Sequence, residues 1–194
     1  MRHFILACLL SLPGIAHAGT VSIEVRGVDG KPLAGAVVQV ESARASAPRI
    51  GGPYSVAQKD IAFQPRVTIV PAGASVSFPN RDRVRHHVYS FSPAKKFELK
   101  LYGHQESHSV TFDRPGVIAL GCNIHDSMTG FIIVTGTPFA AQTSAAGRVV
   151  FDDVPAGAVT LKVWHPSIRA RANILAQAAT VGPQGLSTTL ALRK

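Results

Sequence analysis

Apolar residues at every second position are the feature of this sequence that most constrains its fold. Val21, Ile23 and Val25 alternate with polar residues, and the same alternation returns at 74–78. A period of two places side chains on the two faces of a β-strand, whereas an amphipathic helix needs a period near 3.6. Gly- and Pro-containing turns separate these short runs, which predicts an all-β protein built from β-sandwiches. Residues 170–179, ARANILAQAA, are the one stretch that also has the character of a helix.

The start of the chain has the layout of a secretory signal. Residues 1–18 begin with the basic Arg2, continue through an apolar run from Phe4 to Leu12, and end in small residues before a cleavage site after Ala18. The apolar run is too short to span about 30 Å of hydrocarbon. We therefore expect an exported, periplasmic protein that has no membrane span after cleavage.

Cleavage changes the number of cysteines. Cys8 leaves with the signal, and Cys122 then remains as a single thiol in an oxidising compartment. Such a cysteine is buried and inert, paired between chains, or bound to another group. The metal-binding side chains near Cys122 favour the last of these.

The charge of the chain is basic. Loss of Arg2 lowers the formal net charge from +9 to +8. A positive excess attracts acidic surfaces. Nucleic acid is a poor candidate for an exported protein whose basic stretches lack interleaved aromatic residues, so an acidic protein partner fits better.

Two patches rich in Ala, Ser, Gly and Pro divide the chain. They cover residues 43–53 and 137–147, and they bracket the segment that contains the cysteine. We therefore expect a central module at 54–136. The flanking segments, 19–53 and 137–194, carry further short strands.

One cysteine, one histidine and one methionine follow each other at intervals of three in GCNIHDSM. Cys122 ends an apolar strand, so its sulfur can point inward, and His125 and Met128 follow on one loop. A blue copper site uses a thiolate, two imidazoles and a weak thioether ligand. The second imidazole is His86 or His87, and only one of these points at the metal because adjacent strand residues face opposite sides.

Other interpretations apply to each residue alone. A single cysteine is often a small core residue, and a methionine after a turn often fills a core. A nucleophilic pair of Cys122 and His125 lacks an obvious group to orient the histidine. Structural zinc favours more than one cysteine and makes no use of a thioether. Taken together in an exported β protein, the residues indicate a copper site.

The central module resembles the cupredoxins, the blue copper fold, and most closely their amicyanin and plastocyanin branch. FPNRDRVRHHVYSF (78–91) is similar to the strand that carries the first histidine ligand, with His87 where the family usually has Asn. GCNIHDSM (121–128) is similar to the amicyanin-type ligand loop. The resemblance implies a Greek-key β-sandwich that binds one copper ion. The ligands that it implies are His86, Cys122, His125 and Met128.

The flanking segments have a resemblance of their own. SIEVRGVDGKPLAGAVVQV (22–40) and AAGRVVFDDVPAGAVTLKVWHP (145–166) are similar to strands of a carboxypeptidase regulatory-like, or transthyretin-like, sandwich. If both segments belong to one small sandwich, the cupredoxin is an insertion within it. The whole chain also resembles cupredoxin-containing proteins known as methylamine utilisation proteins.

The resemblance implies electron transport and no enzymatic activity. Copper would alternate between Cu⁺ and Cu²⁺ in a monomer that exchanges electrons with a redox protein. We expect this partner to have an acidic docking surface, because basic residues border the first histidine. These residues are Arg81, Arg83, Arg85, Lys95, Lys96 and Lys100.

Two other functions are compatible with the sequence. Copper carriage or storage without redox turnover is suggested by further histidines, which could form a second site: His87, His104 and His108. A structural module with a relic site is the third possibility.

Overall fold

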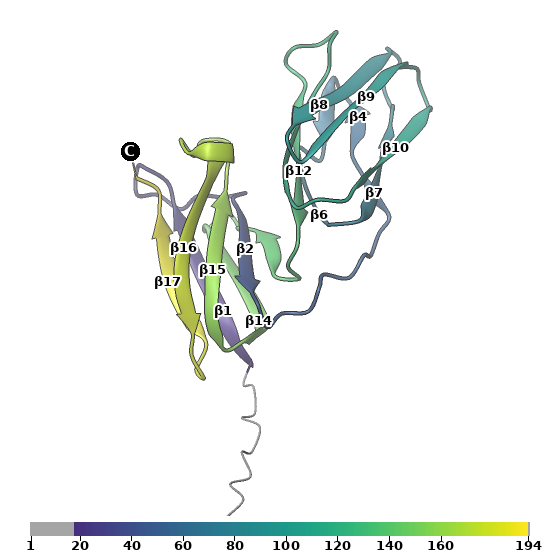
Figure 1. Cartoon of the computed structure of the whole chain (residues 1–194). Coiled ribbons are helices and arrows are strands. Elements are labelled where there is room, and N and C mark those ends of the chain that lie inside the picture. Colours follow the sequence, from purple (N-terminus) through teal and green to yellow (C-terminus); the bar gives the residue numbers. More distant parts are fainter. Residues whose placement is uncertain (1–17, 194) are drawn as a thin grey trace, which may run out of the picture.

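The computed structural model describes residues 18–193, and within that range the chain is all-β, which confirms the predicted fold class (Figure 1). The only helical element of these residues is a three-residue 3-10 helix, η1 (Arg171–Asn173). None of the described helical segments has the length and hydrophobicity to cross a membrane. The predicted export signal, including Cys8, lies outside the described residues except for Ala18.

The first two strands and the last five strands of the described chain form two sheets that pack together, which we term the flanking sandwich. One sheet has the order β14-β1-β17, and the other has the order β13-β2-β15-β16. Strands β1 and β17 run parallel, and the other pairs are antiparallel. The strands are β1 (Ala18–Arg26), β2 (Val37–Ser42), β13 (Ala140–Gln142), β14 (Arg148–Pro155), β15 (Gly157–Trp164), β16 (Ile174–Val181) and β17 (Leu186–Ala191).

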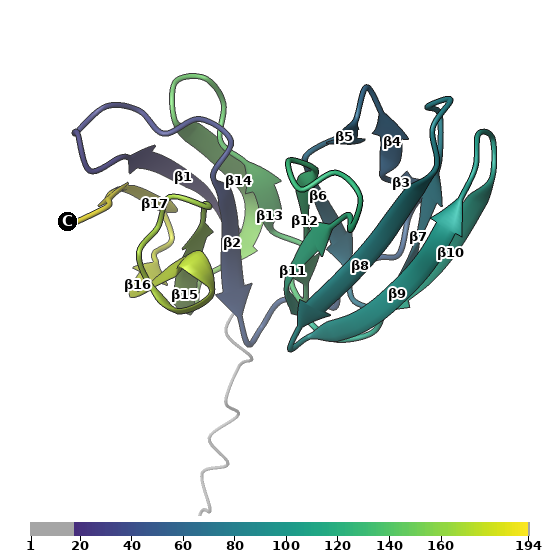
Figure 2. The same cartoon turned by 90° about the horizontal axis from the view of Figure 1, so that it is seen from above.

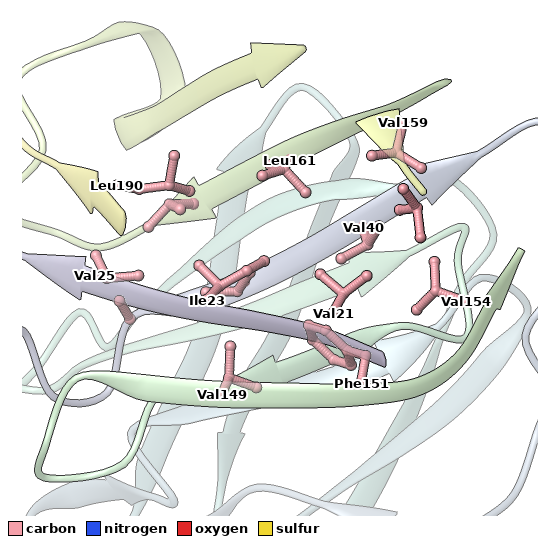
Figure 3. Close-up of a cluster of buried hydrophobic side chains, with 14 of the residues drawn as sticks. Val21, Ile23, Val25, Val40, Val149, Phe151, Val154, Val159, Leu161 and Leu190 are labelled. Atoms are coloured by element: carbon pink, nitrogen blue, oxygen red, sulfur yellow. The ribbon is translucent and has the colours of Figure 1, made fainter. Parts of the chain in front are cut away.

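The alternating residues of the sequence form the core of the flanking sandwich. Val21, Ile23 and Val25 are fully buried along β1, and they face Val40 of β2 and Leu161 of β15 across the two sheets (Figure 3). Burial of each such side chain away from water contributes about 1.5–3 kcal/mol to the free energy of folding. The period of two is therefore the direct cause of the packing between the sheets.

The chain between β2 and β13 forms a second body, which we term the central sandwich. Its larger sheet has the order β6-β12-β11-β8-β9, its smaller sheet has the order β10-β7-β3, and β4 and β5 form a separate hairpin. The strands are β3 (Tyr54–Ser55), β4 (Ala57–Lys59), β5 (Ala62–Gln64), β6 (Val67–Pro71), β7 (Ala74–Pro79), β8 (His86–Ser92), β9 (Lys95–Tyr102), β10 (Ser107–Phe112), β11 (Gly116–Gly121) and β12 (Thr129–Thr135).

The two sandwiches pack side by side through one face of β12 (Figure 2). Ile132 and Val134 enter the core of the central sandwich, whereas Ile133 packs with Val37 and Trp164 of the flanking sandwich. The rings of Phe131 and Trp164 lie 4.8 Å apart. Because both faces of β12 are covered, its sequence is a continuous apolar run and does not alternate.

Two segments differ from their simplest sequence interpretation. The stretch 170–179 forms η1 and then most of β16, which pairs along its length with β15. Its helix-forming alanines are overridden by this pairing. The patch 137–147 contains β13, because Ala140 to Gln142 pair with the edge of β2.

Tyr102, the last residue of β9, is buried in the core of the central sandwich. Its hydroxyl donates to the carbonyl oxygen of Phe78 at 2.8 Å and accepts a hydrogen bond from the amide of Gln58. Burial raises the pKa of Tyr102 to about 12, although the hydrogen bond from Gln58 opposes this shift. The folded protein therefore favours the neutral phenol.

We predict that Tyr102→Phe lowers the free energy of unfolding by about 0.5–1.5 kcal/mol, because the side-chain amide of Gln58 and the carbonyl oxygen of Phe78 each lose one hydrogen bond and keep the one between them. The folded pKa is raised from its usual value of 10.0. The stabilisation from the neutral phenol is therefore complete below pH 10 and is lost as the pH rises toward 12. Urea unfolding from pH 8 to about pH 12 should show the difference between the two proteins shrinking over that interval. A difference independent of pH would contradict this assignment.

Candidate metal centre

The candidate site lies at one end of the larger central sheet, where two segments distant in sequence meet. Strands β11 and β12 form a hairpin that closes with Gly121 opposite Thr129, and residues 122–128 form its loop. Within the loop, the amide of Met128 donates to the carbonyl oxygen of His125 at 2.9 Å. Strand β8 pairs with β11 through Tyr89 and Gly121, which brings the start of β8 to this loop.

His86, Cys122 and His125 come together at this position. An imidazole nitrogen of each histidine and the Sγ of Cys122 lie within 4.8 Å of one another. Ligand atoms about 2.0–2.3 Å from one tetrahedral ion lie about 3.3–3.8 Å apart, so shifts of up to about 1 Å would place this group on one ion. Cys122 carries a free thiol, and Met128 is buried with it in the same apolar cluster.

The two histidines have buried nitrogens that make no hydrogen bond to the described residues 18–193. These are Nδ1 of His86 and Nδ1 of His125. The Nε2 of His86 is already used, since it lies 2.7 Å from a carboxylate oxygen of Asp82. A buried nitrogen without a hydrogen-bond partner lowers the stability of the fold unless it binds another group, such as a metal ion. Nδ1 of His87 is also buried and unpaired, but His87 is not in the cluster with Cys122. The unpaired nitrogens of His86 and His125, on rings that lie near a buried thiol, therefore fit a bound metal ion.

His87 points to a different environment, although it is adjacent to His86. Its Nε2 lies 2.9 Å from Glu98, and its ring packs 5.7 Å from that of Tyr89. The pairing of β8 with β9 shifts register between His86 and Val88. This irregularity, a β-bulge, lies at the two histidines, and both of them are buried.

Asp82 and Asn80 are site residues that the sequence interpretation did not single out. The Oδ1 of Asn80 accepts from the amide of Asp82 at 2.9 Å, which forms a tight turn before β8. The side-chain amide of Asn80 donates to the carbonyl oxygens of Val84 and Tyr102. An Asn followed by an Asp two positions later is the local signal of this turn, but its contact with His86 depends on the fold.

The carboxyl of Asp82 has a perturbed pKa. Burial raises this pKa, but the amides of Ile61 and Asp60 and the ring of His86 hydrogen-bond to the charged form and hold the pKa below its usual value. Asp82 therefore presents an ionised acceptor to His86 at neutral pH.

The remaining histidines of the central sandwich have other contacts. Nδ1 of His104 lies 3.0 Å from the carbonyl oxygen of Asp82, and the ring of His108 packs edge-on against Tyr102. Among the described residues, His86, Cys122 and His125 are the one metal-ligating cluster of three or more His, Cys, Asp or Glu side chains.

The surface near the site is basic and partly apolar. Arg81, Arg83 and Arg85 are exposed on the loop that leads into His86. His125 is half-buried, and its neighbour Ile124 is 48% exposed. Lys96 and Lys100 are exposed further away on β9.

Gly121 precedes Cys122 and allows the Tyr89 ring to lie against β11. A Cβ at Gly121 would come within 2.6 Å of the ring of Tyr89. We predict that Gly121→Ala lowers the free energy of unfolding by about 1–3 kcal/mol, because the ring is forced to move. In a Tyr89→Ala background the same substitution should cost much less, as measured by urea unfolding of the four proteins. Equal costs in both backgrounds would show that the ring is not the obstacle.

Comparisons with known proteins give similar solved structures. No family model and no curated protein match the chain. The copper-containing nitrite reductase of Thermus scotoductus SA-01 is 29% identical with a TM-score of 0.42, over 50% of this chain and 25% of the reductase chain. This chain thus spans about a quarter of that reductase. A purple cupredoxin from Nitrosopumilus maritimus is 19% identical with a TM-score of 0.39, over 43% of this chain and 100% of that one. A mutant of amicyanin in its Cu(I) form is 20% identical with a TM-score of 0.40, over 50% of this chain and 98% of that one.

Proposed function

We propose that the central sandwich binds one copper ion and carries single electrons between redox partners. The observation that carries this proposal is the cluster itself, in which a buried thiol lies within 4.8 Å of two imidazole nitrogens. The buried Nδ1 atoms of both histidines support it, because they have no other partner among residues 18–193. The proposed ligands are His86, Cys122, His125 and Met128.

The ligand types favour copper over other ions. A site with one thiolate, two imidazoles and a weak thioether is typical of blue copper proteins, whereas structural zinc takes four strong ligands and usually more than one cysteine. Met128 is 1% exposed and belongs to the same apolar cluster as Cys122, so a buried thioether is available in the core that holds the thiol.

Copper, when bound, supplies reversible one-electron chemistry. The chain contributes a rigid and dry ligand set, since His86, Cys122 and Met128 are buried at the ends of paired strands. A ligand set that moves little between oxidation states keeps the reorganisation energy of electron transfer small. His125 is half-buried and its Nδ1 is buried, so it has both a candidate ligand atom inside and some exposed surface, and it is our proposed contact point for a partner.

Copper carriage or storage has less support. The histidines that suggested it, His87, His104 and His108, contact Glu98, Asp82 and Tyr102 respectively. They do not form a second cluster among the described residues. Export to the periplasm, a monomeric state, the absence of enzymatic activity and a link to methylamine utilisation remain proposals based on the sequence.

The first test of the function is the visible spectrum. Copper-loaded protein should be intensely coloured, because a copper–thiolate bond absorbs visible light strongly. His86→Ala should abolish the colour, and the matched variant His87→Ala should retain it. Absorption spectra and metal counting of the three proteins provide the measurement. A colourless copper-loaded protein would refute the function, and loss of colour only in His87→Ala would reverse the ligand assignment.

The second test concerns the partner. Exposed arginines before His86 should steer an acidic redox protein toward the site, which raises the association rate more than the affinity. The rate of electron transfer to the natural partner should therefore fall as ionic strength rises, since salt screens exposed charges over about 10 Å at 0.1 M. Changing Arg81 and Arg83 to Glu should remove most of this salt dependence and leave the spectrum unchanged.

A matched control separates local steering from total charge. Changing Lys31 and Arg114 to Glu alters the net charge by the same amount, in the flanking sandwich and at the opposite end of β11 from Cys122. This control should retain the salt dependence in stopped-flow measurements. If both double variants behave alike, the loop before His86 is not the docking surface.

A further inference from the structure

We propose that Asp82 is a positioning residue that sets which nitrogen of His86 is free to bind the metal, and that the tip of the β4–β5 hairpin holds Asp82 in place. This inference rests on the proposed function, because His86 is taken as a metal ligand. It assigns a role to a hairpin that contributes no ligand of its own.

Every polar atom of Asp82 is engaged. One carboxylate oxygen accepts from the amide of Asp60 at 2.8 Å. The other accepts from the amide of Ile61 at 3.0 Å and lies 2.7 Å from Nε2 of His86. The backbone amide donates to Asn80, and the backbone carbonyl oxygen lies 3.0 Å from Nδ1 of His104. The carboxylate is therefore fixed from several directions, and its position fixes the ring of His86.

The two residues at the tip of the β4–β5 hairpin have an unusual backbone conformation. Asp60 and Ile61 have φ values of 56° and 55°, in the left-handed region. A β-branched residue such as Ile is rarely found there. Two successive residues of this kind form the tight hairpin turn that usually takes Asn-Gly. Here both of their amides point at the carboxylate of Asp82, which compensates for the unfavourable conformation.

The chemistry of the carboxylate determines the tautomer of His86. Both carboxylate oxygens of Asp82 accept hydrogen bonds from backbone amides, and an oxygen that also accepts from Nε2 of His86 requires the ring proton on that nitrogen. In the neutral ring the lone pair is then on Nδ1, which is buried without a partner among residues 18–193, in a ring 5.0 Å from that of His125. Carboxylates that hold a metal-binding histidine in this way fix its tautomer and orientation. Without Asp82, the ring is free to place a hydrogen on Nδ1, where it would block the metal.

The first experiment uses the full-length, metal-free protein at pH 8. Long-range ¹H–¹⁵N NMR spectra report which ring nitrogen of each histidine is protonated. His86 should carry its proton on Nε2 in the wild-type protein. In Asp82→Ala, both tautomers should be populated. A wild-type His86 that carries its proton on Nδ1, or an unchanged spectrum in Asp82→Ala, would overturn the inference.

Asp82→Asn distinguishes positioning from a general structural role. Its single acceptor oxygen can still accept from the amide of Ile61 and from Nε2 of His86, but the bond from Asp60 is lost. We therefore expect the wild-type tautomer together with faster hydrogen exchange at the amide of Asp60. Ile61→Gly is the matched hairpin control, since glycine adopts a positive φ without cost and keeps its amide. It should retain both the tautomer and the slow exchange of Asp60.

Metal binding is the second readout, with Cu(I) as the probe and a chromogenic chelator as the competitor. Asp82→Ala should bind Cu(I) about 10–100-fold more weakly than the wild type, and Asp82→Asn less than about tenfold more weakly. Equal affinity in the wild type and Asp82→Ala would refute the positioning role. If the wild-type protein binds no Cu(I), the proposed function fails, whereas the tautomer of the metal-free protein still decides the role of Asp82.

Discussion

The pairing of β8 with β11 is the contact on which the rest of the site depends. Tyr89 lies opposite Gly121, so the first residue of β8 reaches the loop that carries Cys122 and His125. The imidazole rings of His86 and His125 are then 5.0 Å apart. Because these strands also form the core, the candidate ligand atoms are positioned by the same hydrogen bonds and apolar packing that stabilise the sandwich.

Local patterns predicted the fold class, and they singled out the three residues that the structure brings together, His86, Cys122 and His125. The alternation at Val21, Ile23 and Val25 marks one buried face, and these residues have no exposed surface. The spacing of three from Cys122 to Met128 was visible because the loop is continuous in sequence. The role of Asp82 could not be predicted in this way. Its carboxylate accepts hydrogen bonds from Asp60 and Ile61, which lie in a hairpin distant in sequence. Such contacts depend on how sheets pack, which no local period encodes.

Interruptions of the local pattern also limited the prediction. The bulge between His86 and Val88 interrupts the regular pairing of β8 with β9, and both histidines beside it are buried. The alanines of β16 are good helix formers, but pairing with β15 determines their conformation. In β12, an unbroken apolar run reflects two covered faces. In each case a neighbour distant in sequence outweighs the intrinsic preference of the residues.

The insertion of the central sandwich between β2 and β13 links the stability of the two bodies. These two strands pair with each other, so the whole central sandwich is the loop that joins them. A folded insert holds the ends of that loop in fixed positions, whereas an unfolded one makes them a long flexible loop whose closure costs entropy. The flanking sandwich therefore gains from every interaction that keeps the insert folded, including those around Cys122. Through this connection, a ligand bound at one end of the molecule contributes to the order of strands that never touch it.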